Sequence, residues 1–126
     1  MRDSRTILVI EDEPDLREPN AVALAQAGYR VVEAASWDEA YDLVPERDQI
    51  ALILTDLAMP GRAGVARFAE LHARHRRPPV IVLSAYPRMM RMLDGVLDGV
   101  VRWIEKPVDV STVVNAVGEA LDDHRP

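Results

Sequence analysis

The run "IALILT", Ile50 to Thr55, is a nearly unbroken series of apolar and β-branched residues that ends against Asp56. Such a short apolar run is typical of a strand that is covered on both faces of a parallel sheet. Four further runs rich in β-branched residues occur along the chain: "TILVI" (6–10), "YRVVEA" (29–34), "PVIVLS" (79–84) and "VVRWI" (100–104). The sequence therefore predicts five strands, three of them nearly all apolar and central in a sheet.

The stretches between these runs have apolar residues at helical spacing. In the second stretch, Ser36 is followed three residues later by Glu39, a pattern that predicts a helix N-terminus at Ser36. The residues that mark the other four stretches are Leu16, Ala23, Leu24 and Ala27; Val65, Phe68, Ala69 and Leu71 or His72; Met89, Met90, Leu93, Val96 and Leu97; and Val110, Val113, Val114, Val117 and Leu121. Strands that alternate with helices predict an α/β domain with a doubly wound parallel sheet.

Length and composition narrow the class of protein further. The 126 residues suit one domain, 1–126, with a core of moderate size. No apolar run is long enough for a membrane span, and the N-terminus lacks a signal peptide's apolar stretch, so a cytoplasmic protein is expected. The absence of cysteine excludes disulfides and thiolate metal sites. A net charge of −6 argues against direct nucleic-acid binding by this domain.

Polar side chains follow four of the predicted strands. Binding sites in doubly wound sheets form where the carboxyl ends of the strands meet. The residues expected there are the acidic triplet 11–13, Asp56, Ser84 and Lys106. Lys106, in the stretch "WIEKP" (103–107), is the only lysine in a chain that has 15 lysine and arginine residues together.

These residue types favour phosphoryl transfer on a carboxylate. Neighbouring carboxylates repel one another, and a hard divalent cation relieves that repulsion. Oxygen ligands without cysteine or clustered histidine favour Mg²⁺. One carboxylate can then act as a nucleophile toward phosphorus and form an aspartyl phosphate. A lysine suits the neutralising role because its ammonium is a compact point charge, whereas arginine brings a broad planar fork.

Four stretches, "ILVIEDEPDLRE", "LILTDLAMPGRAG", "VIVLSAY" and "DGVVRWIEKPVD", occur in the order and at the spacing of a known family. Through them the chain resembles the receiver domain of two-component response regulators, of the chemotaxis-regulator type, over nearly its whole length. The resemblance implies a flavodoxin-like sheet with the strand order 2-1-3-4-5 and five helices. It also implies that the chain is not an enzyme in the usual sense, since it catalyses only its own phosphorylation and dephosphorylation.

The resemblance assigns roles to particular residues. Asp56 falls on the phosphoacceptor, and Lys106 falls on the family's lysine, whose peptide bond to the following proline is cis there. Ser84 falls on the hydroxyl residue that binds the phosphoryl oxygens, and Trp103 falls on the switch aromatic. The ligands implied for Mg²⁺ are Glu11, Asp12, Asp56 and the backbone carbonyl of Ala58.

The implied function is signal transduction in a phosphorelay. A histidine kinase or a histidine phosphotransfer protein would supply the phosphoryl group to Asp56. The change would then reach the face made by the fourth helix, the fifth strand and the fifth helix, which also allows a homodimer. The sequence does not decide between a stand-alone regulator and a piece of a longer one.

Three alternatives share this architecture. The first is a receiver-like interaction module that works without phosphorylation, against which the intact Asp12, Asp56, Ser84 and Lys106 argue. A flavin carrier would want a phosphate loop after the first strand, where the acidic triplet would repel phosphate. A hydrolase of the haloacid dehalogenase type typically needs a second aspartate two residues after the nucleophile, where this chain has Ala58.

Several other residues receive structural interpretations. Pro19 indicates that the first helix either starts late or is distorted, because proline inside a helix removes a hydrogen bond. Trp37 is expected to pack at the start of the second helix. The histidines His72, His75 and His124 are predicted to be solvated, and Glu13 is predicted to be an acid at the start of a helix without a further role.

Overall fold

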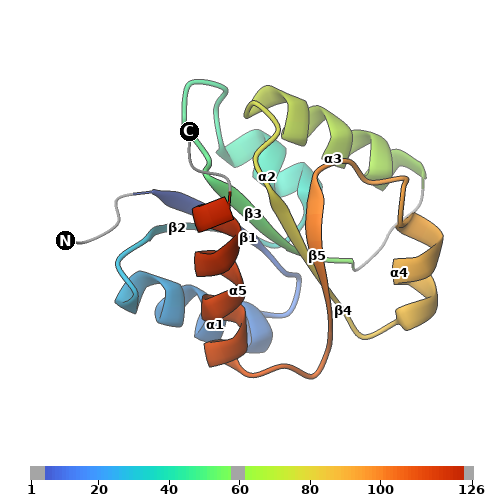
Figure 1. Cartoon of the computed structure of the whole chain (residues 1–126). Helices are drawn as coiled ribbons and strands as arrows, with labels where there is room; N and C mark the ends of the chain where they lie inside the picture. The colour runs from blue at the N-terminus through green and yellow to red at the C-terminus, as the bar shows by residue number, and fades with distance from the viewer. Residues whose placement is uncertain (1–4, 58–61, 124–126) are drawn as a thin grey trace.

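The structure is a computed structural model that describes residues 5–57 and 62–123. Its elements are, in chain order, β1 Thr6–Ile10, α1 Pro14–Gln26, β2 Arg30–Ala34, α2 Trp37–Leu43, β3 Leu52–Asp56, α3 Arg62–Arg74, β4 Val80–Ser84, α4 Pro87–Leu93, β5 Val100–Glu105 and α5 Val110–Asp123. The five strands are parallel and lie in the order β2-β1-β3-β4-β5 (Figure 1). This confirms the predicted flavodoxin-like fold.

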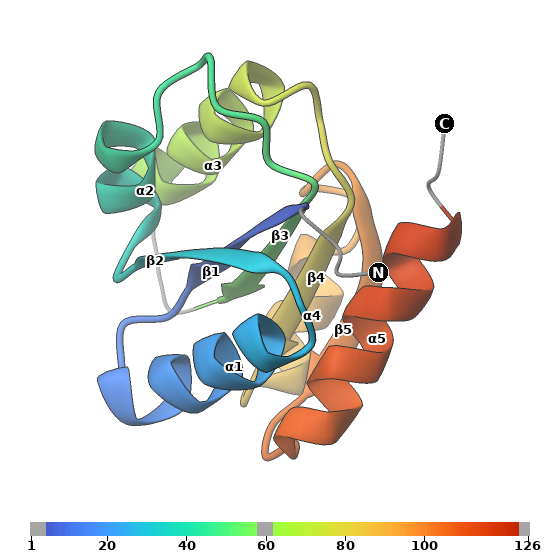
Figure 2. The ribbon, with the colours of Figure 1, turned by 90° about the vertical axis from the view of Figure 1, so that its left-hand side faces the viewer.

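The sheet lies between two layers of helices, as Figure 2 shows edge-on. Alternate side chains of β1, β3 and β4 point to opposite faces, as strand geometry requires. On one face, Ile7, Leu54 and Ile81 pack with residues of α1 and α5. On the other face, Leu8, Ile53 and Val82 pack with residues of α2, α3 and α4. Burial on both faces explains why these strands read as continuous apolar runs.

β5 contains a bulge that the sequence pattern does not reveal. Val80 pairs with Val100, but the next residue of β4, Ile81, pairs with Arg102, so Val101 is an extra residue in β5. Val100 and Trp103 are three residues apart, which would place them on opposite faces of a regular strand. Because of the bulge, both pack against the core that α2, α3 and α4 cover.

Two helices differ from what periodicity predicted. α1 begins at Pro14 and continues through Pro19, so of the two expected consequences of Pro19 the late start is wrong. α4 ends at Leu93, although the apolar spacing continued to Leu97. Asp94 and Gly95 follow, and Gly95 has a φ of +86°, a conformation that ends a helix. Leu97 is still buried, but from the connection that follows α4.

α2 begins as the sequence predicted. The Ser36 side chain accepts a hydrogen bond from the Glu39 N–H at 3.0 Å, and the Glu39 carboxylate accepts one from the Ala35 N–H at 3.2 Å. The first bond satisfies a backbone N–H of the first turn that has no partner within the helix, and the second holds the residue before the N-cap.

The prediction that His72 and His75 are solvated is wrong, since they are only 3% and 5% exposed. The end of α3 lies beneath the connections to β3 and β4. There, His72 Nε2 donates to the Pro78 carbonyl at 2.8 Å and His75 Nδ1 donates to the Asp48 carbonyl at 2.9 Å. The third histidine, His124, lies outside the described residues. Within the described ranges, none of the helices is long and apolar enough to cross a membrane.

Candidate functional site

The strand register brings the predicted site residues to one edge of the sheet. Ile10 of β1 pairs with Thr55 of β3, so the residues that follow them, Glu11 and Asp56, emerge side by side. Ser84 ends β4, and its carbonyl accepts a hydrogen bond from the Lys106 N–H at 2.8 Å. Lys106 therefore leaves β5 directly beside Ser84, and its peptide bond to Pro107 is cis, as the family resemblance implied.

Three carboxylates form a compact cluster at this edge. One oxygen each from Glu11, Asp12 and Asp56 can be chosen so that all lie within 4.8 Å of one another. Glu11 is buried, Asp56 is half-buried and Asp12 is exposed. At an effective dielectric constant near 20, each such pair of charges repels by about 3 kcal/mol. The cluster therefore needs a positive charge close by.

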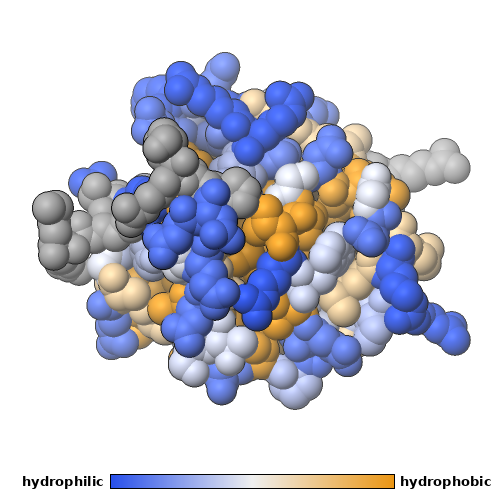
Figure 3. All heavy atoms as spheres, in the orientation of Figure 1, coloured by the Kyte–Doolittle hydropathy of each residue, from blue (hydrophilic) through white to orange (hydrophobic). Residues whose placement is uncertain are grey.

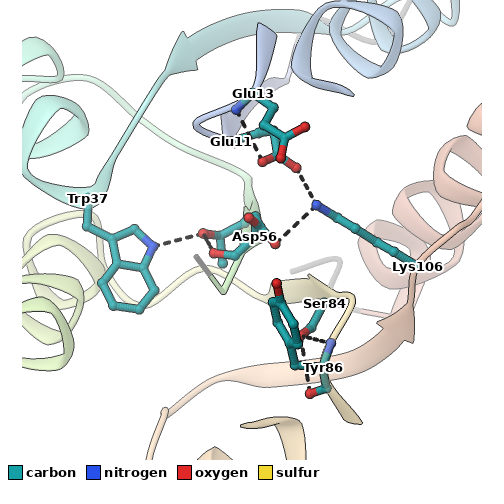
Figure 4. A network of polar contacts seen from close by, with 8 residues as sticks. Glu11, Glu13, Trp37, Asp56, Ser84, Tyr86 and Lys106 are labelled. Carbon is teal, nitrogen blue, oxygen red and sulfur yellow. Dashed lines mark hydrogen bonds and ion pairs between the residues drawn. The ribbon is translucent and has the colours of Figure 1, made fainter. Parts of the chain in front are cut away.

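Lys106 supplies positive charge to two of the three acids. Its Nζ lies 2.5 Å from Glu11 Oε1 and 3.1 Å from Asp56 Oδ1. Figure 4 draws both contacts as dashed lines. Both contacts are partly shielded from solvent, since the side chains of Lys106 and Asp56 are 15% and 13% exposed. Shielding strengthens these charge pairs but also makes each charge costly without its partner.

The titration of Glu11 reflects this environment. Burial raises the pKa of Glu11 to about 7, against the opposing hydrogen bond from Lys106, and the charge of Asp56 adds to the rise. For Lys106, burial alone would lower the pKa, but the hydrogen bond to Glu11 and the charge of Asp56 outweigh burial and raise it. Lys106 thus stays charged, and a further cation beside Glu11 would favour the charged form of that carboxyl.

Ser84 lies at the end of β4 with its side chain fully buried. Its hydroxyl accepts a hydrogen bond from the Tyr86 N–H at 2.9 Å. Within the described part of the chain, this hydroxyl bonds to the Tyr86 backbone rather than to Asp56 or Lys106. Ser84 is therefore at the predicted edge without contacting the acids. Tyr86, drawn beside it in Figure 4, is exposed.

Trp103 and Ala58 complete the predicted set. Trp103 is half-buried against the core beneath α2, α3 and α4, at the carboxyl half of β5. Ala58, predicted to offer a backbone carbonyl to a metal, lies outside the described residues.

Sequence reasoning missed two side chains that hold this edge in place. Arg17 Nη1 donates to the Glu11 carbonyl at 2.8 Å, and Arg17 Nε donates to Glu33 Oε1 at 3.2 Å. Arg17 therefore ties the first turn of α1 to the backbone of the acidic residues. Its place in the sequence carries no signal for this role, because arginine is the usual basic residue of this chain.

The second is Trp37, which was expected only to pack. It does pack, with its ring tilted on Phe68 at a centroid distance of 5.0 Å. Its Nε1 also donates to Thr55 Oγ1 at 2.8 Å, and that hydroxyl donates to the Asp56 carbonyl at 2.9 Å (Figure 4). The sequence could have indicated such a bond, because an indole N–H that is shielded from water needs an acceptor.

The donor set fits a divalent cation of the hard class. Three carboxylates offer oxygen ligands only, and their oxygens are close enough to share one ion. Mg²⁺ typically takes one or two carboxylates and keeps several waters, which the exposed Asp12 would permit. Such a charge would favour the ionised form of Glu11, whose pKa is raised to about 7.

Comparison with known proteins agrees with the geometry. The family model described as "Response regulator receiver domain" matches residues 7–118. Among curated relatives, the transcriptional regulatory protein GlrR of Escherichia coli is 30% identical over 95% of this chain. The phosphate regulon transcriptional regulatory protein PhoB of Pseudomonas aeruginosa is 35% identical over 82% of it. The chain spans only 27% of the first relative and 45% of the second.

Solved structures share the fold. A response regulator receiver domain protein from Methanospirillum hungatei superposes with a TM-score of 0.80 at 22% identity, covering 96% of each chain. A response regulator from Burkholderia pseudomallei, solved with a phosphorylated aspartic acid, calcium ion and citrate, has a TM-score of 0.75 at 25% identity and covers 95% of this chain and 70% of that one. With the family model matched over most of its length, this chain belongs to the response regulator receiver domains of two-component systems.

Proposed function

We propose that this domain accepts a phosphoryl group on Asp56 and requires Mg²⁺ to do so. The observation that carries the proposal is the position of the Asp56 carboxylate. It is paired with the Lys106 ammonium at 3.1 Å, and its oxygens lie within 4.8 Å of those of Glu11 and Asp12. Phosphoryl transfer depends mainly on positioning and charge neutralisation, and this edge of the sheet offers both.

In the proposed step, an Asp56 oxygen attacks phosphorus and forms a new P–O bond. The P–N bond to the donor histidine breaks, and the imidazole leaves with the bonding electron pair. Lys106 then neutralises oxygen charge on the phosphoryl group, while Arg17 and Trp37 hold the backbone of Glu11 and Asp56 in place. Mg²⁺, when held by Glu11, Asp12, Asp56 and the Ala58 carbonyl, supplies further charge neutralisation.

Ser84 and Trp103 would carry the response. We propose that the Ser84 hydroxyl leaves its bond to the Tyr86 N–H and binds a phosphoryl oxygen instead. Trp103 would then move further into the space between β4 and α4. Both residues border the same end of β4 and β5, which supports a linked movement.

The partners follow from this chemistry. A histidine kinase or a histidine phosphotransfer protein would supply the phosphoryl group, and the domain would act in the cytoplasm. The face made by α4, β5 and α5 would receive the signal and form a homodimer or another protein contact. In support, Met92 of α4 and Val101 of β5 are exposed at 75% and 41%. Figure 3 shows apolar residues gathered along β5 with hydrophilic residues around them.

The test is phosphorylation by acetyl phosphate with Mg²⁺, followed by the mass of the intact protein. The wild-type chain should gain one phosphoryl group. Asp56→Asn should gain none, because an amide is a poor nucleophile toward phosphorus. Glu13→Gln is the matched control, since Glu13 is exposed and its removal leaves the other three acids in place.

A wild-type chain that stays unmodified, although folded and supplied with Mg²⁺, would favour the receiver-like module that works without phosphorylation. A phosphoryl group retained by Asp56→Asn would move the acceptor to another residue.

A further inference from the structure

A second concave surface lies at the opposite edge of the sheet, where the strands begin. It is a groove of about 1020 Å³ between the starts of β1 and β2, the α2–β3 connection and the end of α3. Figure 2 shows the α2–β3 connection near the start of β1. We call it the amino-edge groove. Its volume falls at the upper end of the range for small-molecule sites.

The amino-edge groove is cationic although the whole chain is acidic. Five arginines line it, against two acidic residues, Glu46 and Asp48, while the chain as a whole has a net charge of −6. Arg30, Arg47 and Arg76 are exposed, and in the described part of the chain none of these three side chains has an ion-pair partner. A concave surface with an excess of positive charge concentrates anionic ligands.

Arg76 occupies a backbone position that disfavours arginine. Its φ is +65°, and it follows the last turn of α3, where glycine is the usual residue. Its N–H donates to the Ala73 carbonyl at 3.2 Å, which holds the chain in this conformation. Arg77 has a φ of +52° but does not line the groove, so the two arginines can be compared directly.

His75 adds a polar atom without a partner. The ring lines the groove, is 5% exposed, and donates from Nδ1 to the Asp48 carbonyl at 2.9 Å. Its other nitrogen, Nε2, is buried and has no hydrogen-bond partner among the described residues. With Nδ1 as the donor, the neutral ring offers Nε2 as an acceptor. A buried acceptor of this kind normally has a donor, and a hydroxyl or amine of a ligand would supply one if the ring turned Nε2 toward the groove.

We propose that the amino-edge groove binds a phosphorylated small molecule of nucleotide size. Arginine forks match phosphate oxygens in pairs, which accounts for the charge of the rim. Val44 and Ile50 give the groove an apolar floor for a sugar or a base. Nucleic acid is disfavoured because an extended polyanion would reach the acidic remainder of the chain. The site is independent of Asp56, which lies at the other edge of the sheet.

The experiment is calorimetric titration of the whole chain with ADP and with pyrophosphate, in chelator and without Mg²⁺. These conditions leave the acidic edge repulsive to anions, so binding there does not compete. The two probes carry the same number of phosphoryl groups. ADP should bind more tightly than pyrophosphate, because it alone adds hydroxyl and amine donors and an apolar ring. Added salt should weaken both.

Arg76→Asn and Arg77→Asn are the matched variants. Asn tolerates a positive φ, so each removes one charge without new backbone strain. Arg76→Asn should weaken ADP binding by about fivefold or more, and Arg77→Asn should leave it within about twofold. Thermal melting of both variants checks that the fold is kept.

Equal loss in the two variants would mean a diffuse charge effect and would overturn the site. So would an absence of measurable heat with both probes. Pyrophosphate binding as tightly as ADP would overturn the part of the proposal that rests on His75 and the apolar floor.

Discussion

At the scale of single residues, Lys106 shows why one lysine persists in a chain of arginines. Its ammonium reaches Glu11 at 2.5 Å and Asp56 at 3.1 Å from a stem that is mostly shielded from water. A guanidinium is wider and would have to displace one of the two carboxylates in order to reach the other. The position therefore selects a small charge as well as a positive one.

We expect Lys106→Arg to fold but to be phosphorylated by acetyl phosphate at least about tenfold more slowly than the wild type. The initial rate, followed by intact mass, measures this. Arg102→Lys is the control, because Arg102 lies on β5, the strand that leads to Lys106, in an exposed ion pair with Glu119 at 3.6 Å. If Lys106→Arg reacted at the wild-type rate, the lone lysine would be an accident of composition.

His72 makes folding sensitive to mild acid. Burial lowers the pKa of His72 below its usual 6.5, and the neighbouring Arg77 charge lowers it further, while the bond to the Pro78 carbonyl opposes both. The unfolded chain therefore binds the proton more readily than the folded one. The resulting loss of stability begins as pH falls through the unfolded value near 6.5 and is complete below the folded value.

We predict that the free energy of unfolding falls more steeply between about pH 7.5 and about pH 5 in the wild type than in His72→Gln. The glutamine keeps a donor for the Pro78 carbonyl and cannot titrate. Urea unfolding at a series of pH values gives both curves. Parallel curves would mean that His72 is readily protonated in the folded state.

At the scale of elements, α1 contains two prolines in different settings. Pro14 is at the first turn, where its missing N–H would be unpaired in any case. Pro19 is inside the helix, where it removes the bond that its N–H would make to the Asp15 carbonyl. Both rings are exposed, so neither substitution would cost core packing.

We expect Pro19→Ala to stabilise the protein by about 2–2.5 kcal/mol, which is the helix penalty of proline less the entropy it removes from the unfolded chain. Pro14→Ala should change stability by less than about 0.5 kcal/mol in either direction. Denaturant unfolding measures both variants. A destabilised Pro19→Ala would mean that the distortion of α1 serves the fold.

The elements also mark how far sequence reasoning reaches. Strands and helices were predictable because β1, β3 and β4 are covered on both faces and because side-chain periodicity survives in α3 and α5. The bulge at Val101 was not, since it depends on how β5 pairs with β4. The burial of His72 and His75 was missed for a related reason. Each ring bonds to a carbonyl outside α3. For His72 it is the carbonyl of Pro78, beyond the end of the helix, and for His75 it is that of Asp48, in the α2–β3 connection.

The residues of the site also divide into those that the sequence predicts and those that it does not. Glu11, Asp12, Asp56 and Lys106 were predictable because the ends of parallel strands must share an edge, and the structure brings them together. The bonds of Arg17 and Trp37 were not, because each joins a helix to a strand end through side-chain geometry that no spacing encodes.

At the scale of the whole molecule, charge is separated along the strands. Acidic oxygens gather where the strands end, and arginines gather where they begin. Lys106 relieves the repulsion among the carboxylates only in part, because within the described residues it forms ion pairs with Glu11 and Asp56 but not with Asp12. A cation that binds the three acids should therefore stabilise the folded state as a whole.

We predict that Mg²⁺ raises the melting temperature of the wild type more than it raises that of Asp12→Asn. At about tenfold above its dissociation constant, Mg²⁺ should add about 1.4 kcal/mol, or roughly 3–6 °C. Asp12→Asn removes one charge from the cluster, so it should melt higher than the wild type without Mg²⁺ but gain little when Mg²⁺ is added. NaCl at equal ionic strength controls for screening.

Equal shifts in both proteins would mean that Mg²⁺ acts elsewhere on the acidic surface. An unstabilised Asp12→Asn in chelator would mean that repulsion among the carboxylates is already relieved by Lys106 and water.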